Sequence, residues 1–228
     1  VVSSPFFECT ISVPVLKIER VEERPGGAAN VARNCAALGA RVALLSVVGA
    51  DEAGQSLARL LADSSIDASL HEDPQLATTV KLRAIARQQQ LLRIDFENWP
   101  NHEVLQAKLA EFEQRLADCD VVILSDYGKG GLTHIARMIE LARGAGKAVL
   151  VDPKGDDYAR YAGASLITPN RAELRQVVGN WRDEAQLIEK AEALRSGLKL
   201  DGLLVTRSGE GMTLFEAGGH RHEAAQAR

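Results

Sequence analysis

The sequence predicts an α/β fold with a mainly parallel sheet, and two observations carry that prediction. Short apolar runs at residues 121–124 and 148–151 have the length and β-branched content of buried strands. Between them, Ile135, Ile139 and Ala142 recur at the spacing of one helix face. Because strands that alternate with helices pair in parallel and are covered on both faces, we expect one α/β domain of this kind.

The same patterns locate the other elements, and one pair of strands interrupts the alternation. In chain order we expect a lid or edge strand at about 13–20, a helix from Gly26 to Gly39, a strand at 42–48, a helix at 53–62, lid strands within 78–97, helices near 105–116 and 135–142, strands at 121–124, 148–151 and 166–168, helices from Arg171 and near 187–194, and a strand at 203–206. Together they are expected to form a single domain over residues 1–228.

Bulk composition indicates a globular protein and excludes several classes. The 228 residues are 46% hydrophobic and 25% charged, which suits a domain with its own core. The net charge is −4 and the basic residues are scattered, so we expect no nucleic-acid partner. The cysteines lack metal-ligand spacing, and no apolar run has the roughly 20 residues of a membrane span. We therefore expect a cytoplasmic protein with no membrane partner.

Polar side chains follow several predicted strands directly, at the position where α/β folds bind ligands. A carboxylate placed there can bind a sugar hydroxyl or a metal ion, and a lysine can offset phosphate charge. A turn residue or helix N-cap is the structural alternative for each aspartate. The candidates at these strand ends are Asp126, Lys129, Asp152 and Lys154.

Two later segments leave a functional and a structural interpretation open. Asn170 and Glu173 stand three residues apart at a helix start, so they can face one ligand or form a capping box. Thr206, Ser208 and Gly211 have the pattern of a nucleotide-contacting turn, and a hairpin connection has the same pattern.

A glycine pair opens the first predicted helix. Gly26 and Gly27 are small enough for a ligand to approach the backbone, and the side-chain amide of Asn30 can bind sugar hydroxyls. A tight turn packed on a strand is the structural alternative for this segment.

The two predicted strands within residues 78–97 carry a cluster of cations in an acidic chain. Lys81, Arg83 and Arg87 are spaced by two or four residues, so they share a strand face and can meet a phosphate together. A solvated charged face is the alternative.

These stretches together resemble the ribokinase or phosphofructokinase-B-like carbohydrate kinases. The family's first signature is similar to GGAANVARNCAALGARVALLSVVG, from Gly26 to Gly49. Within the family, the heptose 7-phosphate kinases are similar in the segments ERPGGAANVARN, TTVKLRAIARQQQLLRIDFE, SDYGKGGLT, VDPKGDDYARYAGASLITPNRAEL and LLVTRSGEGMTLF. The resemblance covers about residues 13–215 and implies a ribokinase-like three-layer α/β/α fold with a small β lid.

The resemblance also implies an activity and a site. The activity is transfer of the γ-phosphate of ATP, with Mg²⁺, to the anomeric hydroxyl of D-glycero-β-D-manno-heptose 7-phosphate, a step toward the ADP-heptose of lipopolysaccharide core. The substrate residues it implies are Gly26, Gly27 and Asn30 for the sugar and Lys81, Arg83 and Arg87 for its phosphate, and the strand-end candidates Asp126 and Lys129 are also expected to bind substrate. The nucleotide residues are Asp152, Lys154, Asn170, Arg171, Ala172, Glu173, Thr206, Ser208 and Gly211, with Glu173 at the metal. A homodimer through the lid is the implied assembly.

The same resemblance leaves the general base outside the sequence. In this family the base is the aspartate of a Gly-Ala-Gly-Asp type motif at a later helix start, whose N–H groups also stabilise the transferring phosphoryl group. That aspartate is expected beyond Arg228, with the C-terminal part of the fold, and the family's Gly-Asp pair in a first strand has no counterpart before Val13. No catalytic residue is therefore assigned, and negligible kinase activity is expected from this chain alone.

Three alternatives to this kinase remain. The chain can be a non-catalytic sugar-phosphate or nucleotide-binding protein, or a kinase that acts on another sugar. A Rossmann-type dehydrogenase is disfavoured, because no Gly-x-Gly-x-x-Gly turn follows the first predicted strand.

Overall fold

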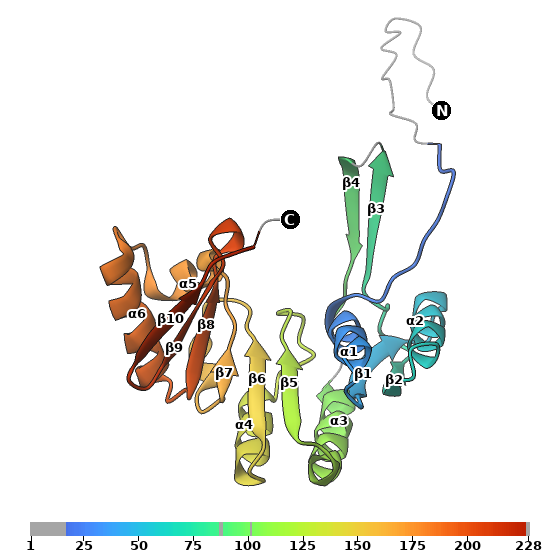
Figure 1. The fold of residues 1–228 in the computed structure, drawn as a ribbon. Coiled ribbons are helices and arrows are strands. Elements are labelled where there is room, and N and C mark those ends of the chain that lie inside the picture. The colour runs from blue at the N-terminus through green and yellow to red at the C-terminus, as the bar shows by residue number, and fades with distance from the viewer. Residues whose placement is uncertain (1–16, 87–88, 101, 227–228) are drawn as a thin grey trace, which may run out of the picture.

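The computed structural model describes residues 17–86, 89–100 and 102–226, in which helices and strands alternate over most of the chain (Figure 1). The helices are α1 (Gly27–Ala37), α2 (Glu52–Ala62), α3 (His102–Arg115), α4 (Ile135–Gly144), α5 (Arg171–Val178) and α6 (Glu184–Gly197). The strands are β1 (Ala43–Gly49), β2 (Asp67–Asp73), β3 (Val80–Ala86), β4 (Gln89–Phe96), β5 (Val121–Ser125), β6 (Ala148–Asp152), β7 (Leu166–Ile167), β8 (Gly202–Thr206), β9 (Met212–Glu216) and β10 (Gly219–Glu223).

Within the described ranges the strands form three sheets. The largest has the order β10-β9-β8-β7-β6-β5, with parallel pairing from β5 to β8 and antiparallel pairing at β9 and β10. Strands β1 and β2 pair in parallel, and β3 and β4 form an antiparallel hairpin that projects from the body of the molecule (Figure 1). The α/β fold with a mainly parallel sheet is thus confirmed.

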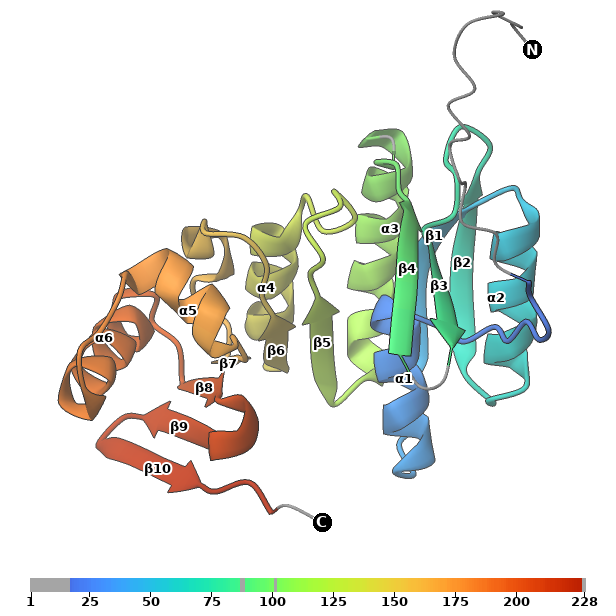
Figure 2. The same cartoon turned by 90° about the horizontal axis from the view of Figure 1, so that it is seen from above.

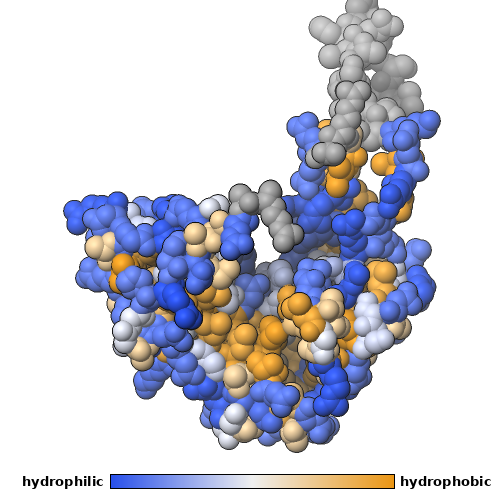
Figure 3. Space-filling model, in the orientation of Figure 1, coloured by the Kyte–Doolittle hydropathy of each residue, from blue (hydrophilic) through white to orange (hydrophobic). Residues whose placement is uncertain are grey.

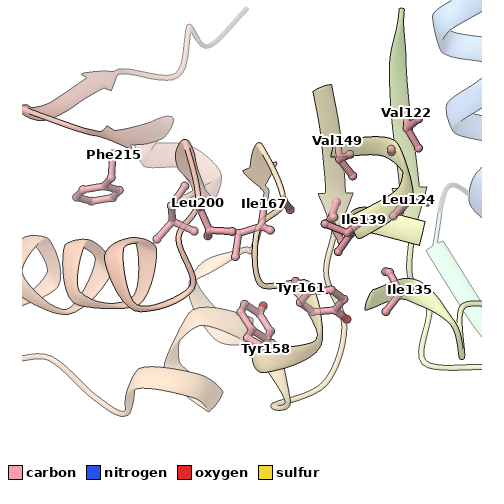
Figure 4. Packing of buried hydrophobic residues seen from close by; sticks show 14 of the residues in the cluster. Val122, Leu124, Ile135, Ile139, Val149, Tyr158, Tyr161, Ile167, Leu200 and Phe215 are labelled. Carbon is pink, nitrogen blue, oxygen red and sulfur yellow. The ribbon is translucent and has the colours of Figure 1, made fainter. Parts of the chain in front are cut away.

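The main core lies between the six-stranded sheet and the helices on one of its faces. Val122 and Leu124 of β5 are buried together with Ile139 of α4, and Ile167 and Phe215 extend the same core along the sheet (Figure 4). Alternate strand residues supply this face, as the two-residue period of a strand requires. Full burial of such a side chain stabilises the fold by about 1.5–3 kcal/mol.

A smaller core lies on the opposite face of β1. Leu44 packs with Leu61 of α2 and Ala32 of α1, whereas the next residue, Leu45, packs against the main core. Because neighbouring strand residues point to opposite faces, α1 and α2 cover one side of β1 while the main core lies on its other side. Figure 2 shows α1, α2 and α3 grouped at one end of the molecule and α5 and α6 at the other.

The second face of the six-stranded sheet is largely uncovered by the helices of the described residues. Val121 and Ile123 of β5 are 47% and 42% exposed, and Met212 of β9 is also exposed. The space-filling view shows apolar side chains gathered in a hollow in the middle of this face (Figure 3). The expectation of helices on both faces therefore applies to β1, while β5 to β8 are buried from one side.

Other differences from the expected elements have physical causes. Residues 17–26 form neither helix nor strand, so the described part of the strand expected at 13–20 is absent; the remainder lies outside the described residues. Here Glu22 pairs with Arg20 and Arg24 of its own segment. Strand β2, DASLHED, was not expected because its polar sequence lacks a strand pattern, and pairing with β1 determines its conformation. None of the helices in the described ranges has the length and apolar character for crossing a bilayer.

Candidate functional site

The loops that follow β5, β6, β7 and β8 lie together at one edge of the sheet. The backbone N–H of Asp126 donates to the carbonyl of Asp152 at 3.0 Å, which joins the first two loops. The N–H of Thr206 donates to the carbonyl of Pro169 at 3.0 Å, and Thr206 also forms a bridge with Asn170. The strand-end candidates therefore meet at one edge, as the parallel pairing predicts.

Asp126 supports the loop that follows β5. Its side chain is only 4% exposed and accepts hydrogen bonds from the Gly128 N–H and the Tyr161 hydroxyl, both at 2.8 Å. The guanidinium of Arg160 lies 3.6 Å away. Both carboxylate oxygens thus have protein partners, and the hydrogen bond to Gly128 stabilises the turn at residues 126–128. Direct binding of a sugar by Asp126 stays a prediction.

The Gly-Gly segment at the start of α1 faces this same loop. Gly26 is the N-cap residue, and Gly27 has a φ of 52°, which favours glycine. A methyl group at Gly27 would lie 3.4 Å from the Tyr127 ring, so Tyr127 covers the start of the helix. Asn30 is exposed in the first turn. The predicted sugar-binding segment is therefore beside the loop that carries Lys129.

The lid hairpin is joined to the loop through a carboxylate that sequence reasoning missed. Lys81 and Arg83 lie on one face of β3, and the Lys81 ammonium is 2.7 Å from Asp95 and 2.8 Å from Glu97 Oε1. The Lys129 ammonium is 2.5 Å from the same Glu97 oxygen. Hydrogen bonds from Lys129 and Lys81 hold the pKa of the Glu97 carboxyl below its usual value. Arg87 lies outside the described residues.

A cavity of about 320 Å³ opens where the lid hairpin meets the loop. Trp99 packs so closely on Gly130 that a methyl group there would lie 2.4 Å from the indole ring. Residues that line the cavity include Trp99, Asp126, Gly128, Gly130, Thr133 and Arg160. Trp99 and Arg160 were not predicted as site residues. For Trp99 the sequence did contain a signal, because a large aromatic residue follows soon after two amphipathic strands.

On the other side of the sheet edge, Asn170 and Glu173 form the capping box that was the structural alternative. The Asn170 side chain accepts from the N–H groups of Ala172 and Glu173 at 2.9 and 3.0 Å. One Glu173 oxygen accepts from the Asn170 N–H at 3.0 Å, and the other pairs with Lys154 Nζ at 2.9 Å. Two predicted residues, Lys154 and Glu173, are therefore in direct contact.

Asp152 shares its surroundings with Glu173. Burial, followed by the negative charge of Glu173, raises the pKa of the Asp152 carboxyl, and Lys154 opposes this shift. Neighbouring carboxylates that repel each other are stabilised by a divalent cation, and Mg²⁺ is commonly bound through one or two carboxylates with phosphate and water completing its shell. The donor set formed by Asp152 and Glu173 fits such a cation.

Thr206, Ser208 and Gly211 form a hairpin connection between β8 and β9, which was the second structural alternative. Gly211 has a φ of 100°, and a methyl group there would lie 2.0 Å from the carbonyl oxygen of Glu223. Ser208 is exposed with a φ of 53°. Arg171, also predicted at the nucleotide side, pairs with Glu210 of this connection.

Comparison with known proteins identifies the family. Residues 7–228 match the sequence profile described as pfkB family carbohydrate kinase. The chain is 52% identical over 215 residues to the D-beta-D-heptose 7-phosphate kinase of Bordetella bronchiseptica, covering 94% of this chain and 69% of that protein. It is 52% identical over 206 residues to the bifunctional protein HldE of Chromohalobacter salexigens, covering 90% of this chain and 43% of that protein. The chain thus spans less than half of the bifunctional relative.

Solved structures share the fold at low identity. The phosphofructokinase-2 of Escherichia coli in complex with fructose-6-phosphate has a TM-score of 0.72 at 20% identity, over 87% of this chain and 67% of that one. A PfkB protein from Polaromonas sp. JS666 has a TM-score of 0.76 at 20% identity, over 94% and 77%. The fold is therefore ribokinase-like, and since the family profile covers almost the whole sequence, the chain belongs to the pfkB family of carbohydrate kinases.

Proposed function

We propose that this chain provides the sugar-phosphate and nucleotide surfaces of a kinase that transfers the γ-phosphate of ATP to the anomeric hydroxyl of D-glycero-β-D-manno-heptose 7-phosphate. The observation that carries the proposal is the convergence of Lys81, from the lid, and Lys129, from the loop after β5, on one oxygen atom of Glu97. Tyr127 of the same loop lies against Gly27 of the Gly-Gly segment. The name of the Bordetella bronchiseptica relative, at 52% identity, supports heptose 7-phosphate as the sugar. The pathway is that of ADP-heptose and lipopolysaccharide core.

In this proposal the sugar phosphate lies between the lid and the sheet edge. Lys81, Lys129 and Arg83 neutralise the phosphate, because ammonium and guanidinium groups form strong charge-assisted hydrogen bonds with phosphate oxygens. Gly26 and Gly27 let the sugar approach the start of α1, and Asn30 binds its hydroxyls. The lid excludes water from the acceptor, which favours transfer to the sugar over hydrolysis.

The nucleotide lies over the other half of the edge in the same proposal. Lys154 sits close to both carboxylates that would hold Mg²⁺, Asp152 and Glu173, and so offsets the charge of the ATP phosphates. When bound, Mg²⁺ neutralises charge on the phosphate oxygens of ATP. Arg171, Ala172, Thr206, Ser208 and Gly211 border the nucleotide. Deprotonation of the acceptor hydroxyl is assigned to no residue of this chain.

The lid also supplies a surface for a second copy of the chain. One face of the β3–β4 hairpin is apolar and exposed, with Leu82, Ile94 and Phe96 being 48%, 40% and 52% exposed. Exposed apolar patches of this kind mark interfaces. We place the homodimer contact there and the protein in the cytoplasm, where ATP is available. Light scattering on Phe96→Ser should show a monomer if the contact is correct.

Calorimetric titration tests the proposal with heptose 7-phosphate, ATP with Mg²⁺, and fructose 6-phosphate as a competitor sugar phosphate. We expect binding of heptose 7-phosphate and ATP, with fructose 6-phosphate weaker than heptose 7-phosphate. An assay of ATP-dependent phosphorylation run on the same samples separates binding from turnover. Absence of heptose 7-phosphate binding would sink the proposal, and preference for fructose 6-phosphate would identify a kinase of another sugar.

A further inference from the structure

Glu97 connects two cations that come from distant parts of the chain. It follows β4 directly, and its Oε1 atom contacts Lys81 Nζ at 2.8 Å and Lys129 Nζ at 2.5 Å. Lys81 belongs to the lid strand β3, whereas Lys129 belongs to the loop after β5. Two ammonium groups that meet at one oxygen would repel each other without an anion between them. Glu97 therefore supplies counter-charge where the lid meets the loop, and Asp95, 2.7 Å from Lys81, adds to it on the lid side.

The position of Glu97 also allows its side chain to move away from the two lysines. Its side chain is 35% exposed, and both of its ion pairs within the described residues use the same oxygen, Oε1. A phosphate monoester carries up to two negative charges and three terminal oxygens, so it can engage both ammonium groups more strongly than one carboxylate oxygen does. Rotation of Glu97 into solvent would release Lys129 and leave Lys81 paired with Asp95 alone, without moving the backbone.

We propose that Glu97 is an internal substitute for the phosphate of the substrate, and that the sugar phosphate displaces it from Lys81 and Lys129. The inference rests on the proposed function and adds a specificity-determining residue to it. In the free protein the carboxylate holds the two cations in place and competes for them. A sugar without a phosphate cannot displace it, so the competition favours phosphorylated substrates over free sugars.

A competing internal anion lowers the apparent affinity for every ligand that needs the same cations. The apparent dissociation constant is the intrinsic one divided by the fraction of protein in which the site is open. Removal of the charge from residue 97 should therefore tighten the binding of phosphate ligands. Since half-exposed ion pairs are individually weak, the expected gain is about threefold to tenfold.

The test is calorimetric titration of the protein and of Glu97→Gln with heptose 7-phosphate and with inorganic phosphate. We expect both ligands to bind Glu97→Gln about threefold to tenfold more tightly. Glu140→Gln is the matched control, because it removes one negative charge from an exposed ion pair with Arg137 on α4. Its affinities should equal those of the unmodified protein. Glu97→Ala repeats the measurement with a side chain that cannot contact the lysines.

The outcomes separate the inference from the proposed function. Unchanged or weaker phosphate binding by both Glu97 variants would overturn the inference while leaving the kinase proposal intact, since Glu97 would then only position the lysines. Failure of the unmodified protein to bind heptose 7-phosphate would instead overturn the proposed function, and the inference with it. Equal tightening by Glu140→Gln would overturn the inference as well, because the cause would be net charge.

Discussion

Two clusters of charged residues in this molecule use the same chemistry in different ways. In the first, Lys81 and Lys129 share one carboxylate, that of Glu97, at the junction of the lid and the sheet edge. In the second, one buried cation, Arg207, pairs with two carboxylates, those of Glu184 and Glu210, and is only 9% exposed. The lysines of the first cluster are accessible to solvent, at 34% and 24% exposure, whereas the guanidinium of Arg207 is enclosed.

The difference separates charges that can bind a ligand from charges that hold the fold. Arg207 joins α6 to the β8–β9 connection through Glu184 at 2.6 Å and Glu210 at 2.7 Å, and its guanidinium also lies 3.2 Å from the hydroxyl of buried Thr213. Its donors are directed at protein acceptors, so it has little left for an anion. A cation near a site is therefore a ligand candidate when the cation itself is accessible to solvent, as Lys81 and Lys129 are.

Arg207→Met should have the largest effect on stability. The substitution removes the donors that Arg207 gives to Glu184, Glu210 and Thr213. Within the described residues only Glu210 and Thr213 then keep another partner, Arg171 and His222 respectively. We expect a loss of about 2–3 kcal/mol in the free energy of unfolding. Urea denaturation followed by circular dichroism measures it. Arg137→Met, which breaks the exposed pair with Glu140, is the control and should cost about 0.5 kcal/mol or less. If Arg207→Met and Arg137→Met lower the free energy of unfolding equally, Arg207 does not hold the fold more strongly than an exposed ion pair does.

Lys129→Met should act on ligand binding and leave the fold nearly unchanged. A charge-assisted hydrogen bond to phosphate contributes about 1.5–3 kcal/mol, so the affinity for heptose 7-phosphate should fall about 10- to 100-fold. Titration calorimetry measures the affinity, and thermal denaturation checks the fold. Lys147→Met, on the turn that precedes β6, is a matched surface control. An unchanged affinity would show that Lys129 does not contact the phosphate.

Gly130→Ala should loosen the contact between the lid and the loop. Gly130 has a φ of 75°, and the added methyl group would meet the Trp99 ring at 2.4 Å. Left-handed backbone alone costs a non-glycine residue about 1–2 kcal/mol, and the clash adds to that. The double variant Gly130→Ala/Trp99→Ala removes the clash with the indole ring but keeps the cost of the left-handed backbone. If the double variant is no more stable than Gly130→Ala in urea denaturation, the indole does not rest on this glycine.

The elements at the sheet edge were predictable, while the contacts between distant segments were not. The Asp126, Asp152 and Asn170 positions follow from strand periodicity, because parallel strands end at a common edge. The capping box and the hairpin at Gly211 were visible as structural alternatives, and the structure contains both. Glu97 carried no signal, since a glutamate after a charged strand is ordinary in sequence. Its partner Lys129 is brought to it only by tertiary folding.

Asp152 extends the comparison to a partly buried carboxylate that forms no ion pair within the described residues. Its substitution should change the free energy of unfolding less than those of Arg207 and Gly130 do. Burial and the charge of Glu173 raise its pKa in the folded state, so the folded protein holds this proton more tightly than the unfolded chain. The contribution of Asp152 to stability is therefore greatest below the unfolded pKa near 3.8. It declines as the pH rises from there through the higher pKa of the folded state. Asp152→Asn removes this penalty, so we expect the variant to be more stable than the unmodified protein at pH 7, with a smaller gain at pH 4. Urea denaturation at pH 7 and pH 4 measures both. Added Mg²⁺ should raise the melting temperature of the unmodified protein and leave that of Asp152→Asn unchanged. If Asp152→Asn is more stable at pH 7 but Mg²⁺ raises both melting temperatures equally, Asp152 is not a ligand of the proposed metal site.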